Sequence, residues 1–237
     1  MDNAGYVSLT RQTGLLEELR TVAQNVANAS TVGYRREGVV FSEYVKGTGG
    51  ESLSMARAGA HYVDQQQGVL KRTGGTFDVA IEGDGYFSVE TDDGERLTRA
   101  GNFALSDIGE LVTHEGQRVL SDGGGAIAIP EGTGTVAIGG DGTISADGEI
   151  LARLGVSTAD ARDLIREGNN LFRAAKGAQP ADDFKVAQGF LEQSNVNTVA
   201  EISRLIEVQR AYELGQGLME REHNRMTSMI QTLGRSV

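Results

Sequence analysis

Apolar residues recur at seven-residue intervals toward both ends of this chain, and this repeat constrains the fold more than any other feature of the sequence. Toward the C-terminus the repeat is carried by Leu205, Tyr212, Met219, Met226 and Leu233. Toward the N-terminus an alternating spacing of four and three residues is carried by Leu15, Leu19, Val22 and Val26. Because this spacing places the side chains on one stripe of a helix, as in a coiled coil, the sequence predicts a long helix at each end.

The expected C-terminal helix is long relative to the size of the chain. A helix over residues 198–234 would be about 55 Å long at about 1.5 Å per residue, whereas a globule of 237 residues has a diameter of only about 45 Å. A narrow apolar stripe that extends past its own domain must be buried by another helix. Two alternatives stay open: the terminal helices pair only with each other, or the pair also packs against copies from other chains.

The middle of the chain has the composition of a β domain with many tight turns. Residues 68–150 contain 18 of the 33 glycines. Phe77, Val79 and Ile81 alternate with less apolar residues, which is the periodicity of a strand. Asp-Gly pairs, which tolerate the backbone angles of hairpin turns, begin at positions 84, 93, 122, 141 and 147. The pattern predicts an antiparallel domain of sandwich or barrel type.

Together these patterns predict an α+β fold, in which long N- and C-terminal helices form a coiled-coil layer and the middle of the chain forms a central antiparallel β domain of sandwich or barrel type. The expected divisions are an N-terminal helix over 1–34, an extended linker or subunit-specific arm over 35–75, the β domain over 76–190 and a C-terminal helix over 191–237. Residues 31–67 are polar and contain glycine. This segment is therefore either an arm that bridges neighbouring subunits or a flexible connection.

The acidic charge of the chain is concentrated in its central stretch. The chain has 22 Lys and Arg against 33 Asp and Glu, a formal net charge of −11. Residues 68–150 carry 5 basic and 15 acidic residues, so both ends are close to neutral. Because nucleic acids and anionic membranes require a basic surface, neither is an expected partner. The chain has no run of 18 apolar residues, and it is not expected to be membrane-embedded.

No set of residues has the sequence arrangement of a catalytic or metal site. The chain has no cysteine, and its three histidines are far apart in the sequence. The acidic stretch Asp141–Glu149 departs from a calcium loop, because Thr143 and Ser145 stand where such a loop has its next acidic or amide ligands. Solvated hairpin turns explain these carboxylates instead. We therefore expect no enzyme activity, no cofactor and no metal.

Three regions of the chain together resemble one protein family. The first is Asn25–Arg36, the second is Phe77–Phe87 followed by Thr98–Phe103, and the third is Gln188–Asn197 continuing to Gln209–Glu213. In this order, and reaching nearly both ends of the chain, they are similar to the signature segments of the axial proteins of the bacterial flagellum, the rod and hook family. The combination of all three is far more specific than any one of them.

The resemblance implies a structural subunit of the flagellar basal-body rod, a tubular drive shaft in the periplasm that transmits torque. In such proteins the terminal helices form the inner coiled-coil layer and the β domain faces outward. The size of the chain and its start, Met1–Tyr6, resemble a proximal-rod subunit, with a distal-rod subunit as the alternative. The implied partners are other rod proteins, copies of the same chain, surrounding ring proteins and, during secretion, the flagellar export apparatus.

The subunit contacts are expected on the seven-residue repeats at the two chain ends. These heptad residues are Leu15, Leu19, Val22, Val26, Leu205, Tyr212, Met219, Met226 and Leu233. Each Leu or Met buried between subunits would contribute roughly 1.5–3 kcal/mol. The competing hypothesis, from a different class of function, is a free-standing secreted binding module whose helices close only on each other.

Overall fold

The computed structural model describes residues 2–48, 51–181 and 183–234, and the chain divides into two compact units. The helical unit comprises Met1–Ala27, Glu37–Tyr62 and Asn197–Val237. The β unit comprises Asn28–Arg36 and Val63–Val196. The chain therefore passes between the two units four times, and we call these four passages the crossings.

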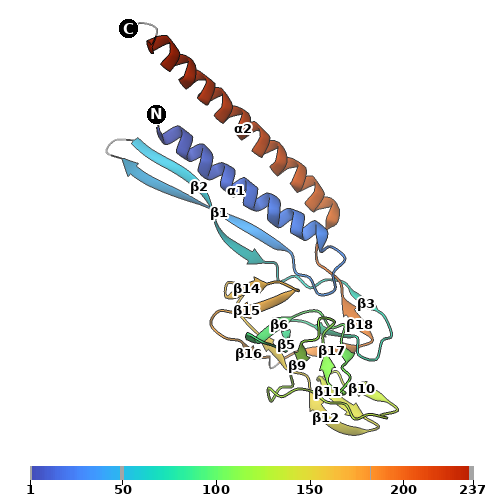
Figure 1. The fold of residues 1–237 in the computed structure, drawn as a ribbon. Coiled ribbons are helices and arrows are strands. Elements are labelled where there is room, and N and C mark those ends of the chain that lie inside the picture. Colours follow the sequence, from blue (N-terminus) through green and yellow to red (C-terminus); the bar gives the residue numbers. More distant parts are fainter. Residues whose placement is uncertain (1, 49–50, 182, 235–237) are drawn as a thin grey trace. The chain divides into compact units, whose positions relative to one another are not determined.

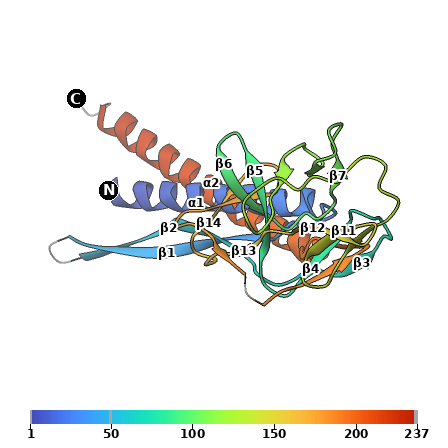
Figure 2. The same ribbon diagram turned by 90° about the horizontal axis from the view of Figure 1, so that it is seen from below.

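The helical unit consists of two helices and a long β-hairpin. Its elements are α1 (Asp2–Ala27), β1 (Glu37–Thr48), β2 (Glu51–Val63) and α2 (Thr198–Gly234). Both ribbon views show α1 lying between α2 and the hairpin (Figure 1, Figure 2). At the start of α2, the side-chain oxygen of Asn197 accepts a hydrogen bond from the amide of Ala200 at 3.1 Å. Asn197 is therefore the N-cap that begins the helix.

The β unit is built from short strands that the sequence separates by turns. Its strands are β3 (Leu70–Arg72), β4 (Val79–Glu82), β5 (Tyr86–Thr91), β6 (Gly94–Thr98), β7 (Ala104–Leu105), β8 (Leu111–Val112), β9 (Arg118–Val119), β10 (Val136–Ile138), β11 (Thr143–Ala146), β12 (Glu149–Arg153), β13 (Val156–Thr158), β14 (Leu164–Glu167), β15 (Leu171–Ala174), β16 (Gln179–Pro180), β17 (Lys185–Gln188) and β18 (Phe190–Glu192).

These strands form one large sheet and three small ones. The large sheet has the order β14-β15-β6-β5-β9-β8-β7, with β13 pairing with both β5 and β16. The small sheets are β10-β11-β12, β17-β4 and β18-β3. In the last two, a strand from the end of the β unit pairs antiparallel with one from its beginning. The late part of the chain is therefore needed to complete this unit.

A continuous apolar core fills the β unit. Its buried residues are Val79, Ile81, Phe87, Val89, Phe103, Leu111, Val119, Ile127, Ile138, Ile144, Leu154, Val156, Leu171 and Val186. Phe87 and Phe103 meet edge to face with ring centroids 5.1 Å apart. The alternation predicted at Phe77, Val79 and Ile81 places the last two in this core, with Phe77 partly buried against it.

Two of the predicted Asp-Gly turns differ in what they connect. Asp147 and Gly148 have φ angles of 50° and 91° and join β11 to β12, which pair antiparallel. This is the predicted hairpin turn, since both residues adopt the left-handed backbone that such a turn needs. Asp84-Gly85 instead joins β4 to β5, which belong to different sheets. The hairpin turn predicted at Asp84-Gly85 is therefore wrong.

The predicted fold class with a coiled-coil layer is also wrong. The described residues contain two helices, and most of the remaining chain is β-rich, with no long coiled-coil layer. The cause lies in the side of α1 that is buried. The buried side chains of α1 include the polar residues Gln12, Glu18, Thr21 and Asn25. Of the four heptad residues of α1, only Val22 is buried, and the other three are partly exposed. A polar contact surface of this kind does not form the apolar seam of a coiled coil.

Candidate functional site

The heptad residues are distributed unevenly between interior and surface of the helical unit. Val22 is buried, whereas Leu15, Leu19, Val26, Leu205, Tyr212 and Met219 are partly buried. Met226 is 41% exposed. Leu233 lies in α2, but its side chain falls outside the described residues. The structure thus brings the repeats of the two helices into one unit without burying them completely.

Polar contacts align α1 with α2. Gln12 Nε2 donates a hydrogen bond to the carbonyl oxygen of Tyr212 at 2.9 Å. Arg204 Nε donates to Glu18 Oε1 at 2.7 Å, and this bond raises the pKa of the Arg204 guanidinium. Because the start of α2 lies beside the end of α1, the two helices run antiparallel.

The antiparallel alignment leaves the end of α2 without cover from α1. Gln12 lies beside Tyr212, and both helices rise about 1.5 Å per residue, so Asp2 lies level with roughly position 222. Met226 and Met229 lie beyond that point and are 41% and 53% exposed. The apolar repeat of α2 therefore continues past the helix that could bury it.

Further apolar surface lies along the covered part of α2. Val199, Ile202 and Ile206 are exposed and follow one another at helical spacing on one face. Leu214 and Leu218 are also exposed, and they line a cavity of about 330 Å³ between α2 and residues 8–15 of α1. Several large apolar side chains exposed along one helix are typical of a site of contact with another protein.

In the β unit, three charged side chains form a buried group that we call the junction cluster. It consists of Arg35, Arg99 and Glu192. Arg35 Nη2 lies 2.9 Å from Glu192 Oε1, and Arg99 Nη1 lies 3.2 Å from Glu192 Oε2. All three are at most 3% exposed. Burial lowers the pKa of the Arg99 guanidinium, and the nearby Glu192 carboxylate opposes that shift.

The junction cluster holds together segments that are far apart in the sequence. Gly68 donates its amide hydrogen to Glu192 Oε1 at 3.0 Å, and Gly33 donates to the carbonyl oxygen of Glu192 at 2.8 Å. Arg35 Nη1 donates to the carbonyl oxygen of Gln65 at 2.9 Å. One carboxylate thereby organises three passages of the chain.

Aromatic rings surround the same segments. The Arg166 guanidinium lies 4.4 Å from the ring centroid of Tyr34 and 4.5 Å from that of Phe172. Its Nη2 donates to the carbonyl oxygen of Arg35 at 2.5 Å. The Tyr86 hydroxyl donates to Gln65 Oε1 at 2.8 Å, and burial raises the pKa of that phenol.

The sequence did not predict the junction cluster. Arg35, Arg99 and Glu192 each stand in one of the three segments that carry the family resemblance. Many other charged residues of the chain have no such role, and the burial of these three is visible only in the structure. Their shared position in the three segments therefore hints that the segments matter, but it does not show that the segments meet.

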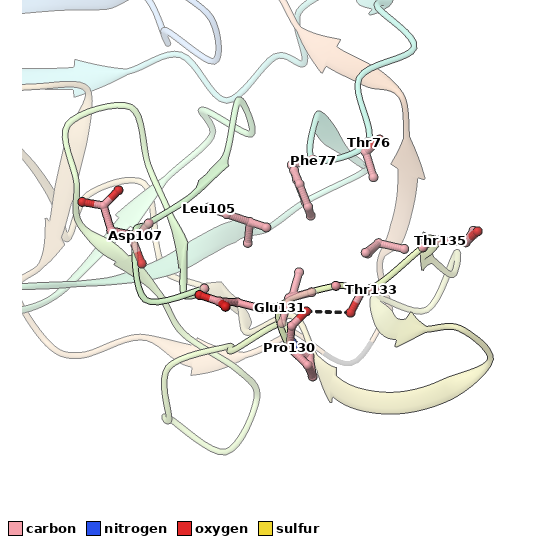
Figure 3. A pocket seen from close by; sticks show the side chains of 14 residues that line it. Thr76, Phe77, Leu105, Asp107, Pro130, Glu131, Thr133 and Thr135 are labelled. Carbon is pink, nitrogen blue, oxygen red and sulfur yellow. Dashed lines mark hydrogen bonds between the residues drawn. The ribbon is translucent and has the colours of Figure 1, made fainter.

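One hollow of the β unit offers no catalytic arrangement. A cavity of about 480 Å³ is lined by residues of the loops around 105–109 and 129–136 (Figure 3). Its ionisable lining residues are Asp107 and Glu131, and Figure 3 shows the Asp107 carboxylate pointing away from the other labelled side chains. Thr133 Oγ1 donates to the carbonyl oxygen of Pro130 at 2.7 Å, which closes the turn in this lining.

The acidic turns are likewise explained by local hydrogen bonds. Asp141 Oδ1 accepts the amide of Thr143 at 3.0 Å, and this bond lowers the pKa of Asp141. Asp147 accepts the amides of Gly134 and Thr135. Among the residues that the structure describes, no group of three His, Asp or Glu is placed to hold a metal ion. Neither helix, as far as it is described, is apolar enough to cross a membrane.

Comparisons with known proteins agree on one family. Residues 80–146 match the model of the flagellar hook protein FlgE/F/G D1 domain, and residues 187–232 match that of the flagellar basal body rod FlgEFG protein C-terminal region. The flagellar basal-body rod protein FlgF of Mesorhizobium japonicum is 40% identical over 99% of both chains. FlgF of Rhizobium meliloti is 39% identical over the whole of both chains. FlgG of Bacillus subtilis is 34% identical over 88% of this chain and 90% of its own.

The chain has a long helix near each end, with exposed apolar side chains, and the β unit lies between these helices in the sequence. Together with the two family matches, this organisation defines a structural subunit of the flagellar rod. Within that class, the chain belongs to the family of the basal-body rod protein FlgF. The identity to FlgF relatives is higher and covers more of the chain than the identity to the FlgG relative, so the distal-rod alternative is the weaker one. The protein is accordingly a component of the flagellar basal body.

Proposed function

We propose that this subunit assembles into the proximal rod, in the periplasm, through its terminal helices, with other rod proteins and copies of itself as partners. The observation that carries the proposal is the exposed apolar repeat of α2 beyond the end of α1, at Met226 and Met229. A helix end of this kind is stabilised by an apolar surface from another chain. Its contacts then add to those that each subunit already makes internally.

The geometry of a shaft requires different surfaces on the two sides of each contact. Open helical assembly joins one patch to a different patch on the next subunit. The end of α2 and the face carrying Val199, Ile202 and Ile206 are two such distinct apolar patches on one helix. With roughly 1.5–3 kcal/mol for each apolar side chain that becomes buried, several contacts repeated along a shaft resist twisting without any single strong bond.

The nine heptad residues remain the proposed partner-binding set, with an order of importance. Met226 contributes most directly, because α1 does not reach it. The partly buried residues, such as Leu205 and Met219, contribute through the side that α1 leaves open. Val22 supports the contact indirectly by fixing α1 against its neighbours.

The proposed role is mechanical and requires no catalytic group or cofactor, in keeping with relatives that are named as rod proteins. In this proposal the chain reaches its site through the flagellar export apparatus and then transmits torque. The acidic stretch over 68–150 faces solvent or surrounding ring proteins, because like charges repel when they are packed closely.

Met226→Asp tests the proposal with little effect on the isolated subunit. The variant places a charge where the proposal buries an apolar side chain, so incorporation into isolated basal bodies should be lost. Asn224→Asp is the matched control, because it adds the same charge at an exposed polar position of the same helical region. Normal incorporation of Met226→Asp, as judged by immunoblotting of purified basal bodies, would contradict the proposal.

Sedimentation of the purified chain tests the competing binding module. A rod subunit should associate at rising concentration, and removal of residues 1–30 should change that association. A compact monomer at all concentrations, with helix amides strongly protected from hydrogen exchange, would favour the free-standing module instead.

A further inference from the structure

The four crossings between the two units converge on two sets of hydrogen-bonded residues, one inside each unit. The crossings lie at the junctions 27/28, 36/37, 62/63 and 196/197. A subunit that transmits torque must carry load through these four passages of the chain, because they are the covalent connections between its units. How they are held inside each unit therefore determines how that load is shared.

Inside the β unit, the passages next to the crossings are tied to one another. Arg36 donates its amide to Asn195 Oδ1 at 2.7 Å, and Asn195 Nδ2 donates to the carbonyl oxygens of Asp64 and Gln66 at 3.2 and 2.8 Å. Asp64 donates its amide to the carbonyl oxygen of Arg36 at 2.8 Å. Together with the Glu192 contacts described above, these bonds connect residues 28–36, 63–68 and 190–196.

Inside the helical unit, a second group connects the chain next to three of the four crossings, and we call it the asparagine cluster. Asn25 Nδ2 donates to Glu201 Oε2 at 3.1 Å and to the carbonyl oxygen of Glu37 at 2.8 Å. Asn25 Oδ1 accepts the amide of Glu37 at 3.0 Å. Asn25 is fully buried and Glu201 nearly so. The end of α1, the start of β1 and the start of α2 are thus held by one side chain.

We propose that the junction cluster with Asn195, inside the β unit, and the asparagine cluster, inside the helical unit, act as a pair of clamps that make the crossings carry load together. The first clamp holds the chain next to all four crossings, and the second holds it next to three of them. This inference rests on the proposed torque-transmitting function. Bonds that are stretched in parallel share a force, whereas unclamped passages would be stretched and released one after another. The clamping residues are positioning residues, with Glu192, Asn195 and Asn25 at the centre of the two groups.

The chemistry of the junction cluster suits a clamp. Two arginines share one buried carboxylate, and removing one partner of a buried ion pair leaves charge without compensation. The cluster therefore cannot open partially at low cost. Glu167 offers a contrast in the same unit, since it also pairs with two arginines, Arg96 and Arg173, but its side chain is 35% exposed. A surface ion pair of this kind contributes little.

Hydrogen exchange of the full chain, read by mass spectrometry, tests the clamp directly. In Glu192→Gln the amides of Gly33, Gly68 and Asn195 should exchange about tenfold faster or more, together, because they depend on one buried contact. The core strands β4 and β5 should change much less. Asn195→Ala, which removes no charge, should accelerate the same segments, and Glu167→Gln is the matched control. Acceleration spread evenly over the whole β unit, or absent from these segments, would overturn the clamp.

Swimming speed at increasing viscosity tests whether the clamp carries load. Cells that carry Glu192→Gln or Asn195→Ala should lose speed more steeply with viscosity than cells that carry Glu167→Gln, because load on the rod rises with drag. Local acceleration of exchange with unchanged swimming at every viscosity would overturn the load-sharing role. Failure of the proposed function is distinguishable, because it would appear as normal incorporation of Met226→Asp while the exchange pattern stayed as expected.

Discussion

The two units of this protein differ in how completely they bury their apolar side chains. In the β unit, Phe87, Val89 and Phe172 are completely buried by other residues of the same unit. In the helical unit, Val199 and Leu214 remain 75% and 72% exposed. The β unit also exposes apolar side chains such as Val69 and Ile108, but it encloses a continuous buried core. Among the described residues of the helical unit, by contrast, the buried apolar side chains are Val22 and Val208, so most of its apolar surface is not covered within the unit.

A narrower contrast holds for ion pairs. The β unit places Arg35, Arg99 and Glu192 together in its interior, where each is fixed by its partners. The helical unit also buries Glu18, but its partner Arg204 is 49% exposed and pairs with Glu207 at the surface as well. Buried polar groups specify one arrangement, and exposed pairs tolerate several. The ion pairs inside the β unit therefore fix its structure more strongly than the ion pairs along α2 do.

The largest difference between the units should appear on removal of one large side chain from each. Phe87→Ala should reduce the free energy of unfolding by about 3–5 kcal/mol, because it leaves a cavity in a packed core. Leu214→Ala should change it by less than about 0.5 kcal/mol, since that side chain is exposed. Urea unfolding of the full chain, followed by circular dichroism, measures both. Equal losses would show that the isolated helical unit is as well packed as the β unit.

A second, smaller effect is expected from a close backbone contact that belongs to the packed interior of the β unit. Gly33 has a φ of 66°, and a Cβ atom there would lie 2.3 Å from the carbonyl carbon of Arg99. Gly33→Ala should therefore destabilise the unit by about 3 kcal/mol through backbone strain and overpacking.

Gly168→Ala is the control for this prediction, because nothing lies within 4 Å of the added Cβ. It should leave the unfolding midpoint in urea nearly unchanged. If the two alanine variants unfolded at the same urea concentration, the close approach between Gly33 and the backbone of Arg99 would have no energetic role.

This glycine also shows how much of the fold the sequence could predict. The sequence predicts an N-terminal helix over 1–34, a range that includes Gly33, whereas α1 ends at Ala27, a few residues earlier. The structural reason for a glycine, its approach to Arg99, joins residues far apart in the chain, and no local pattern contains that information. Local signals such as the Asp147-Gly148 turn were confirmed for the opposite reason, since they depend only on neighbouring residues.

The candidate sites show the same difference between local patterns, which the sequence predicts, and contacts between distant residues, which it does not. The seven-residue repeat correctly indicated two helices, because periodicity is a local property. It did not indicate that polar residues such as Gln12 and Glu18 would occupy the buried side of α1, because that depends on the residues of α2 and β1 that pack there. The junction cluster could not be assembled from the sequence, since Arg35 and Glu192 come together only after the strands have paired.

Two glycines of α2 provide a matched test of the contact between the helices. Gly217 has open space around it, so Gly217→Ala should stabilise the helix by about 1 kcal/mol. At Gly215 a Cβ atom would lie 2.2 Å from Gln12 Nε2, the atom that donates to the carbonyl oxygen of Tyr212. Gly215→Ala should therefore stabilise the helix less than Gly217→Ala by about 1 kcal/mol, because the same gain in helix propensity is offset by the loss of this hydrogen bond.

Thermal unfolding monitored through the helical signal in circular dichroism measures both variants. The melting temperature should rise for Gly217→Ala and should change little for Gly215→Ala. If both variants raised the melting temperature equally, α1 and α2 would not be in close contact at Gln12 in the isolated chain.

The smallest expected effect concerns the charged surface of the β unit. Hydrogen bonds from Arg173 and Arg96 lower the pKa of Glu167 below the ordinary value of 4.5. A carboxyl group whose pKa is lower in the folded state contributes stability above its unfolded pKa and loses that contribution as the pH falls through the folded pKa. Glu167→Gln removes this contribution, so the difference in urea midpoint between the variant and the unmodified chain should be slight near neutral pH and should shrink further below pH 4.5. A large difference in urea midpoint at neutral pH would mean that surface ion pairs, and not the core alone, stabilise the β unit. The contrast between its packed interior and the open surface of the helical unit would then need a different explanation.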